Sequence, residues 1–134
     1  MKIISWNVNS IRARIENFLE VAKQENPDIF LLQETRVDDP LFPMEYFEDL
    51  GYNVAIKGQK GRNGVAICSK HCLEEVRSDF SEEARYIEAF TGGVFVASIY
   101  VPNGQEVDAP QYFHKLDFLQ NLKNKFLSFI GETF

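Results

Sequence analysis

The sequence of 134 residues contains few cysteines and histidines and has an excess of acidic over basic residues. Cys68, His71 and Cys72 form a Cys-x-x-His-Cys pattern, and His114 is the only other histidine. A structural zinc site needs about four ligands at suitable spacing, and no second pair of cysteines or histidines is present. We therefore expect two reduced thiols, as is usual inside the cell.

Long apolar runs are also absent. No stretch of the sequence is long and apolar enough to cross a bilayer. The first residues lead directly into a strand-like pattern and lack the apolar segment and cleavage site of a signal peptide. The sequence thus predicts a cytoplasmic protein without a membrane partner, and its length allows one compact domain.

Basic residues are too few for a generic nucleic-acid-binding surface. The 20 acidic and 14 basic residues give a net charge of −6, whereas such surfaces neutralise phosphates with lysine and arginine. A magnesium enzyme can still act on phosphate, because the bound ion supplies the local positive charge. The negative net charge therefore does not exclude a magnesium enzyme that acts on phosphate.

The hydrophobic pattern predicts an α+β fold that begins with a parallel crossover unit. A strand over 2–8 is followed by an amphipathic helix over 11–24 and a buried strand over 29–32. The later segments predict a short helix at 44–49, strands at 52–56, 65–68, 73–77, 86–90 and 94–101, and a closing helix at 112–129. We expect one mixed, mainly antiparallel sheet flanked by helices, with the glycine-rich loop (57–64) joining two paired strands.

Polar side chains follow the first two strands of the crossover unit. Because the carboxyl ends of parallel neighbours lie at one edge of a sheet, we expect Asn7, Asn9, Gln33 and Glu34 to converge. One carboxylate among neutral oxygens suits Mg²⁺, which keeps several water ligands. From spacing alone, ordinary turn chemistry with a solvated Glu34 explains the pattern better, since one carboxylate is little evidence.

Two motifs favour the metal-site interpretation over ordinary turn chemistry. Ser-Trp-Asn-Val-Asn-Ser-Ile-Arg-Ala at 5–13 and Pro-Asp-Ile-Phe-Leu-Leu-Gln-Glu-Thr-Arg at 27–36 resemble the opening motifs of the exonuclease III family of abasic-site endonucleases and 3′-exonucleases. Similar segments follow in order at 51–54, 58–61, 64–66 and 99–104. The resemblance implies half of the four-layer α/β sandwich of the DNase I-like (endonuclease/exonuclease/phosphatase) superfamily.

The resemblance also implies roles for single residues. Glu34 matches a metal-binding glutamate, Asn7 an asparagine that helps to hold metal and phosphate, and Tyr100 a tyrosine whose hydroxyl meets the scissile phosphate. The implied cofactor is Mg²⁺, with Mn²⁺ as an alternative. The residues at or near DNA contacts are Asn9, Arg12, Lys60, Arg62, Arg85 and Asn103. On their own, the basic residues are also consistent with solvated surface charges, an interpretation favoured most for Arg85, and Asn103 is consistent with a turn cap.

Two catalytic segments of the family have no counterpart in the sequence. Neither the Gly-Asp-x-Asn segment with the aspartate base nor the later Ser-Asp-His segment is present. We therefore expect residues 1–134 to be the N-terminal part of one domain whose C-terminal half is absent. Such a chain should expose the inner face of its sheet, be inactive or weak alone, and either self-associate or bind a complementary C-terminal half.

The function that the resemblance implies is Mg²⁺-dependent phosphodiester hydrolysis by an exodeoxyribonuclease III or abasic-site endonuclease of base-excision repair. Its partner would be double-stranded DNA with abasic sites or 3′ ends. Two alternatives remain open: a superfamily phosphatase that acts on inositol phosphates, lipids or nucleotides, and a catalytically silent domain that binds DNA or a partner protein.

Overall fold

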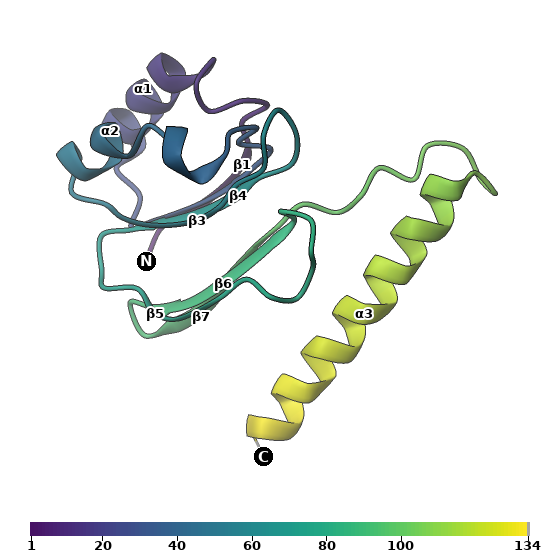
Figure 1. The fold of residues 1–134 in the computed structure, drawn as a ribbon. Helices are drawn as coiled ribbons and strands as arrows, with labels where there is room; N and C mark the ends of the chain where they lie inside the picture. The colour runs from purple at the N-terminus through teal and green to yellow at the C-terminus, as the bar shows by residue number, and fades with distance from the viewer. Residues whose placement is uncertain (134) are drawn as a thin grey trace. The chain divides into compact units, whose positions relative to one another are not determined.

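The chain forms two compact units, Met1–Tyr100 and a shorter unit that starts at Val101 (Figure 1). The computed structural model describes residues 1–133, with side chains through residue 129. The first unit contains both sheets and two of the helices. The second contains one long helix.

A four-stranded sheet, which we call sheet A, has the strand order β1-β2-β4-β3. Strands β1 (Ile3–Asn7) and β2 (Ile29–Gln33) are parallel and are connected by α1 (Ile15–Glu25). Strand β4 (Val65–Ser69) pairs antiparallel with both β2 and β3 (Asn53–Lys57). The predicted parallel crossover and the predicted antiparallel pair around the glycine-rich loop are confirmed.

Helices α1 and α2 (Met44–Asp49) cover one face of sheet A (Figure 1), and the short 3₁₀ helix η1 (Asp39–Leu41) precedes α2. Phe18 of α1 lies at the centre of this core. Its ring centroid is 4.7 Å from that of Phe30 in β2 and 4.5 Å from that of Phe47 in α2. Cys68 of β4 belongs to the same core, and burial raises the pKa of its thiol, whereas Cys72 is exposed.

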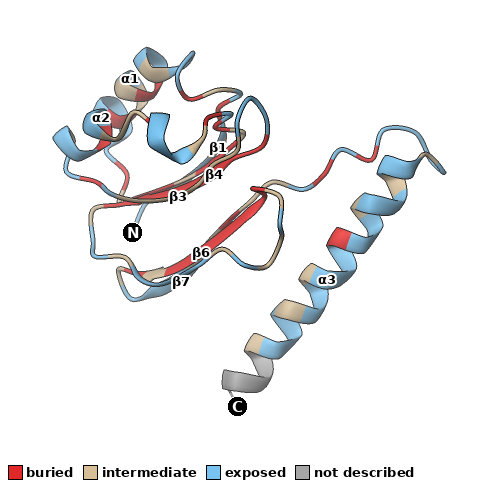
Figure 2. Ribbon diagram, in the orientation of Figure 1, coloured by how far each residue is buried: buried red, intermediate tan, exposed pale blue. Residues whose placement is uncertain are grey.

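The other face of sheet A is covered by sheet B, a three-stranded antiparallel sheet. Its strands are β5 (Glu74–Arg77), β6 (Tyr86–Thr91) and β7 (Val94–Ile99). The β6–β7 hairpin turns at Gly92 and Gly93, which both have positive φ. A second core lies between the sheets and comprises Ile29, Val65, Ile67, Ile87 and Ala89; Figure 2 shows buried residues on the facing strands.

Two expectations about the sheets are wrong. The α+β class is confirmed, but the strands form two sheets rather than one. The inner face of sheet A is not left open, because β6 packs on it. Hydrophobic periodicity locates each strand but does not say which strands share a ladder, and the connection from β4 to β5 carries the chain into a new layer.

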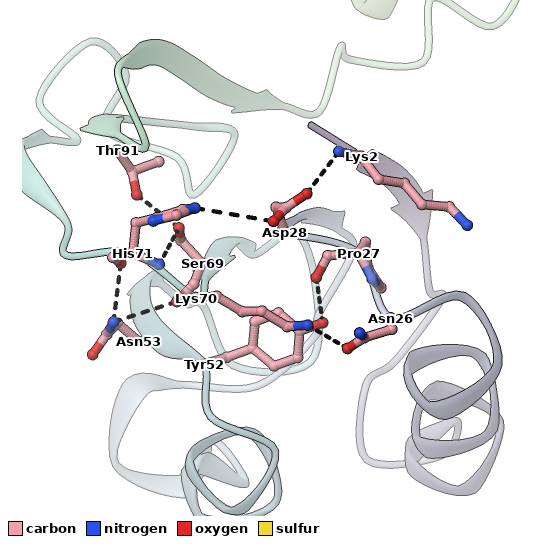
Figure 3. A network of polar contacts seen from close by, with 10 residues as sticks. All are labelled: Lys2, Asn26, Pro27, Asp28, Tyr52, Asn53, Ser69, Lys70, His71 and Thr91. Atoms are coloured by element: carbon pink, nitrogen blue, oxygen red, sulfur yellow. Dashed lines mark hydrogen bonds and ion pairs between the residues drawn. The ribbon is translucent and has the colours of Figure 1, made fainter.

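A polar network joins both sheets at the edge where β1 and β2 begin (Figure 3). The Tyr52 hydroxyl donates a 2.6 Å hydrogen bond to the carbonyl oxygen of Pro27. The hydroxyl oxygens of Ser69 and Thr91 lie 2.7 Å apart and link β4 to β6. This network fixes the end of the unit opposite to the carboxyl ends of β1 and β2.

The second unit contains α3 (Pro110–Thr133), which is longer at both ends than the predicted helix over 112–129. Proline at the first helical position is compatible with a helix start, because the N–H that it lacks would have no intrahelical partner there. The exposed apolar side chains of α3 include Phe113, Leu116, Leu119, Phe126 and Leu127. In the described part of the chain, no helix combines the length and apolarity that a membrane span requires.

Candidate active site

The candidate site lies where β1, β2 and β7 end. Asn7 and Gln33 are paired as the last residues of β1 and β2, and Glu34 follows immediately. Tyr100 follows the last residue of β7. The site is therefore built from both sheets, with the crossover unit supplying the carboxylate and sheet B supplying the phenol.

Glu34 and Tyr100 form a direct pair across the two sheets. The Tyr100 hydroxyl donates a short hydrogen bond to Oε1 of Glu34, while Nη2 of Arg36 lies 3.2 Å from Oε2. Burial raises the pKa of Tyr100, and the hydrogen bond and negative charge of Glu34 raise it further against the opposing charges of Arg85 and Arg36. Tyr100 is therefore a protonated hydrogen-bond donor at neutral pH.

The backbone around Glu34 is held in an unusual conformation. Glu34 and Arg36 have φ values of +55° and +54°, and Ser10 has +83°. Residues other than glycine adopt this region at a cost, and such positions concentrate at functional sites. Backbone hydrogen bonds hold it in place: Ser10 N–H donates to the Glu34 carbonyl at 2.8 Å, and Arg36 N–H donates to the Asn63 carbonyl at 2.8 Å.

Asn7 and Asn9 are exposed and form a local turn at the end of β1. The Asn9 N–H donates to Oδ1 of Asn7 at 3.1 Å. The helix predicted over 11–24 begins only at Ile15, with Arg14 at its N-cap, so this turn lies outside it. Asn7 and Asn9 thus reach the predicted edge of the sheet.

Gln33 does not join them. Its side-chain amide is buried and donates to Ser5 Oγ at 3.2 Å, to the Leu31 carbonyl at 3.0 Å and to Ser98 Oγ at 3.1 Å. The expected convergence of Gln33 with Glu34 is therefore wrong. Gln33 instead satisfies polar groups between the two sheets, where an unpaired amide would be costly.

Arg85 lies against Tyr100 and is only 8% exposed. Its guanidinium carbon is 5.0 Å from the centre of the Tyr100 ring, and its Nε donates to the Glu83 carboxylate. The backbone of Tyr100 donates to the Arg85 carbonyl at 2.8 Å. The reading of Arg85 as a solvated surface charge is wrong, and its predicted DNA contact stays a prediction.

The other predicted DNA contacts lie on loops. Arg12 is exposed beside Ile11, whose N–H donates to the Thr35 carbonyl at 3.1 Å. Lys60 and Arg62 are exposed on the glycine-rich loop. Two loops that carry exposed cations therefore flank the segment that follows β2.

Asn103 belongs to the second unit. Its Oδ1 accepts a 2.9 Å hydrogen bond from the Gln105 N–H, which is turn-capping geometry. A DNA contact by Asn103 stays a prediction.

The donor chemistry at the site fits part of a magnesium site. Among the described residues, no group of three or more His, Cys, Asp or Glu side chains could hold a metal ion by itself. Mg²⁺ is commonly bound by one or two carboxylates and several waters. Glu34 could supply one such carboxylate, and the amide oxygen of Asn7, which also accepts the Asn9 N–H, is a second ligand of the right type.

The sequence profile of the endonuclease/exonuclease/phosphatase family matches residues 4–127. The chain belongs to this family.

Members of the family with related sequences include bacterial nucleases. The chain is 37% identical over 114 residues to exodeoxyribonuclease III of Haemophilus influenzae, a match that covers 78% of the chain and 43% of that protein. It is 34% identical to the exodeoxyribonuclease of Bacillus subtilis over an alignment of 142 positions, which covers 98% of the chain and 53% of that protein. The chain thus spans about half the length of the curated relatives that it matches.

Solved structures of the family show the same fold. An AP endonuclease from Archaeoglobus fulgidus matches with a TM-score of 0.87 at 41% identity, over 91% of this chain and 49% of that one. A 3′-5′ exonuclease from Neisseria meningitidis matches with a TM-score of 0.88 at 33% identity, over 92% and 50%. The predicted half of a DNase I-like sandwich is therefore confirmed.

The sequence did not reveal the residues that support Tyr100 through Arg85. The sequence assigned no role to Glu83, Gln59 or Asn63, yet all three belong to the hydrogen-bonded cluster around Arg85. The one available signal was the Glu-x-Arg spacing of Glu83 and Arg85 directly before a strand, which is common on protein surfaces.

Proposed function

We propose that this chain supplies the glutamate and tyrosine side of a divalent-metal-dependent DNA nuclease site. The substrate would be double-stranded DNA at abasic sites or 3′ ends, and the role would be base-excision repair in the cytoplasm. The observation that carries the proposal is the Glu34–Tyr100 pair, which two sheets bring together at the edge where Asn7 ends β1. The kinship with exodeoxyribonucleases supports the choice of DNA as substrate.

Each side chain has a task in phosphodiester hydrolysis. Mg²⁺, or Mn²⁺ in its place, held by Glu34 and Asn7 would polarise a phosphoryl oxygen and stabilise charge on the leaving oxygen. Tyr100 stays protonated, and its hydroxyl, which donates to Glu34 in the chain alone, would turn to donate a hydrogen bond to the phosphoryl group as negative charge develops. The exposed cations of Arg12, Lys60 and Arg62 can contact backbone phosphates on either side.

The same proposal treats residues 1–134 as the N-terminal part of one domain. The chain spans about half of its relatives, and its sequence has no Gly-Asp-x-Asn segment to supply the base that activates water. We therefore expect little incision by the chain alone. A complementary C-terminal half should complete the site.

A fragment-complementation assay tests the function. A duplex with one abasic site is incubated in Mg²⁺ with the chain alone, with the C-terminal half of the B. subtilis exodeoxyribonuclease alone, and with both. We expect incision only in the mixture, and we expect Glu34→Gln to lower its rate at least about 100-fold. Glu20→Gln, a change of the same kind on the exposed face of α1, should leave the rate unchanged.

Magnesium titration of the chain provides an independent check. We expect calorimetry to show weaker Mg²⁺ binding for Glu34→Ala than for the unchanged chain. Equal binding by both, together with no incision in the mixture, would favour the catalytically silent domain. Replacing the DNA with an inositol phosphate in the mixture tests the phosphatase alternative directly.

A further inference from the structure

A cluster of hydrogen bonds around Glu83 connects the glycine-rich loop to the start of β6. Oε2 of Glu83 accepts from Nε of Arg85 and, at 3.4 Å, from Nδ2 of Asn63. Oε1 of Gln59 accepts from the same Asn63 amide at 2.9 Å and from the Ala84 N–H at 3.2 Å. One carboxylate therefore contacts both the loop and the arginine that packs on Tyr100.

The arginine in this cluster needs the carboxylate. Arg85 is 8% exposed, and a buried guanidinium without a partner is strongly unfavourable. Glu83 is the only residue with which Arg85 forms an ion pair among the described residues. Without Glu83, the Tyr100 carbonyl is the one acceptor that remains to the Arg85 guanidinium among the described residues, so we expect the guanidinium to turn toward solvent and leave its place over the Tyr100 ring.

Arg85 in turn fixes Tyr100. In addition to the ring contact at 5.0 Å, Nη1 of Arg85 donates to the Tyr100 carbonyl at 3.4 Å, and the Tyr100 N–H donates to the Arg85 carbonyl at 2.8 Å. A guanidinium over a phenol ring is attracted by the ring's negative face. The Tyr100 ring, whose hydroxyl contacts Glu34, therefore packs against the Arg85 guanidinium. That guanidinium is paired with Glu83.

We propose that Glu83 is a positioning residue, which holds Arg85 against Tyr100 and the glycine-rich loop beside it. It acts through Arg85 and Asn63 and sets the places of the Tyr100 hydroxyl and of the exposed cations Lys60 and Arg62. Its consequence for substrate rests on the proposed nuclease function. Its structural part does not, because the contacts exist in the chain itself.

Nuclear magnetic resonance on the isotope-labelled chain tests the structural part. The variants are Glu83→Ala, Glu83→Gln and Glu82→Ala, since Glu82 is the exposed neighbour and its removal changes the net charge equally. We expect Glu83→Ala to shift the Nε–Hε signal of Arg85 and the ring signals of Tyr100. Glu83→Gln keeps an acceptor for Arg85 and should shift them less, and Glu82→Ala should leave them in place.

Unchanged Arg85 and Tyr100 signals in a folded Glu83→Ala chain would overturn the proposal. Urea unfolding of each variant establishes that the chain is folded, so that a general loss of structure is not read as loss of positioning. If Glu83→Ala does not fold, the comparison of Glu83→Gln with Glu82→Ala decides, because Gln keeps the size of the side chain.

Binding to a fluorescent abasic duplex tests the consequence for substrate. Replacing either glutamate with alanine removes one negative charge, and this change alone strengthens attraction to DNA. We therefore expect Glu82→Ala to bind as well as the unchanged chain or better, and Glu83→Ala to bind at least about threefold more weakly than Glu82→Ala. Equal strengthening by both changes would contradict a role of Glu83 in arranging the cations.

The NMR experiment and the DNA-binding experiment test the positioning role and the proposed nuclease function separately. If the unchanged chain does not bind the duplex but Glu83→Ala still shifts the Arg85 and Tyr100 signals, the proposed substrate is wrong and the positioning role stands. If the chain binds DNA but those signals do not move, the positioning role is wrong and the nuclease proposal is untouched.

Discussion

Replacement of Tyr52 by phenylalanine should change the stability of the first unit in a pH-dependent way. Tyr52 is 3% exposed, and its hydroxyl donates a 2.6 Å hydrogen bond to the Pro27 carbonyl. Tyr52→Phe keeps the ring and removes only this bond, which leaves the carbonyl without that donor. At pH 7 we expect the free energy of unfolding to fall by about 1–2 kcal/mol.

At alkaline pH this difference should disappear. Burial raises the pKa of Tyr52 to about 12, with the Cys68 thiol and the Asp28 carboxylate adding to the effect. An unfolded tyrosine has a pKa of about 10, so the folded state keeps a proton that the unfolded state loses. The stabilisation is complete below about pH 10 and is lost toward pH 12 at about 1.4 kcal/mol per pH unit, or about 3 kcal/mol in all.

The phenylalanine variant has no hydroxyl and escapes this loss. Its deficit of about 1–2 kcal/mol at pH 7 should therefore shrink above pH 10 and vanish or reverse near pH 12. Urea unfolding at a series of pH values measures this through the fluorescence of Trp6, the single tryptophan, whose ring centroid lies 6.4 Å from that of Phe18. Tyr46→Phe is the control, because Tyr46 is 40% exposed on α2.

A Tyr52→Phe deficit that stays constant from pH 7 to pH 12 would refute the reasoning. It would mean that the hydroxyl ionises equally easily in the folded and unfolded states, and hence that the site is open to water. A similar pH dependence in Tyr46→Phe would assign the effect to general alkaline unfolding instead.

Two further changes test the core and the backbone at the site. Phe18→Ala removes the ring that Phe30 and Phe47 contact at 4.7 and 4.5 Å, and should lower the free energy of unfolding by about 3–5 kcal/mol in urea titrations. Gly64→Ala places a Cβ 2.1 Å from Oγ1 of Thr35 at a residue with φ of +100°. It should cost more than about 1 kcal/mol and shift the amide signals next to Thr35, and an unperturbed spectrum would contradict that geometry.

The elements could be predicted because their signals are local. Helix α1 ends at Glu25, one residue past the end of the helix predicted over 11–24, and Gly92 and Gly93 form the turn between the strands predicted at 86–90 and 94–101. The pairing of strands into sheets is non-local. Nothing in the exposed sequence of β5, Glu74–Arg77, indicates that it pairs with β6 instead of joining sheet A.

The site was predictable only in part, for the same reason. Glu34 follows directly from the end of a parallel strand, whereas its partner Tyr100 lies 66 positions away and was assigned through the family resemblance alone. Gln33 was misplaced because its strand position does not reveal Ser98 on the opposite sheet. Arg85 was misread because the Glu-x-Arg spacing, common on protein surfaces, does not show that the Glu83 carboxylate pairs with a buried guanidinium.

The ion pairs divide the basic residues of this acidic chain into two groups. Arg36 and Arg85 each form an ion pair with a carboxylate, Glu34 and Glu83, which already neutralises part of their charge. The exposed Arg12, Lys60 and Arg62 form no ion pair within the described residues, and they lie on the loops that flank the segment after β2. A net charge of −6 therefore says little about this surface: the exposed cations that the proposed DNA contact would use are separate from those that build the site, and substitution of the two groups should have different effects on affinity and on site geometry.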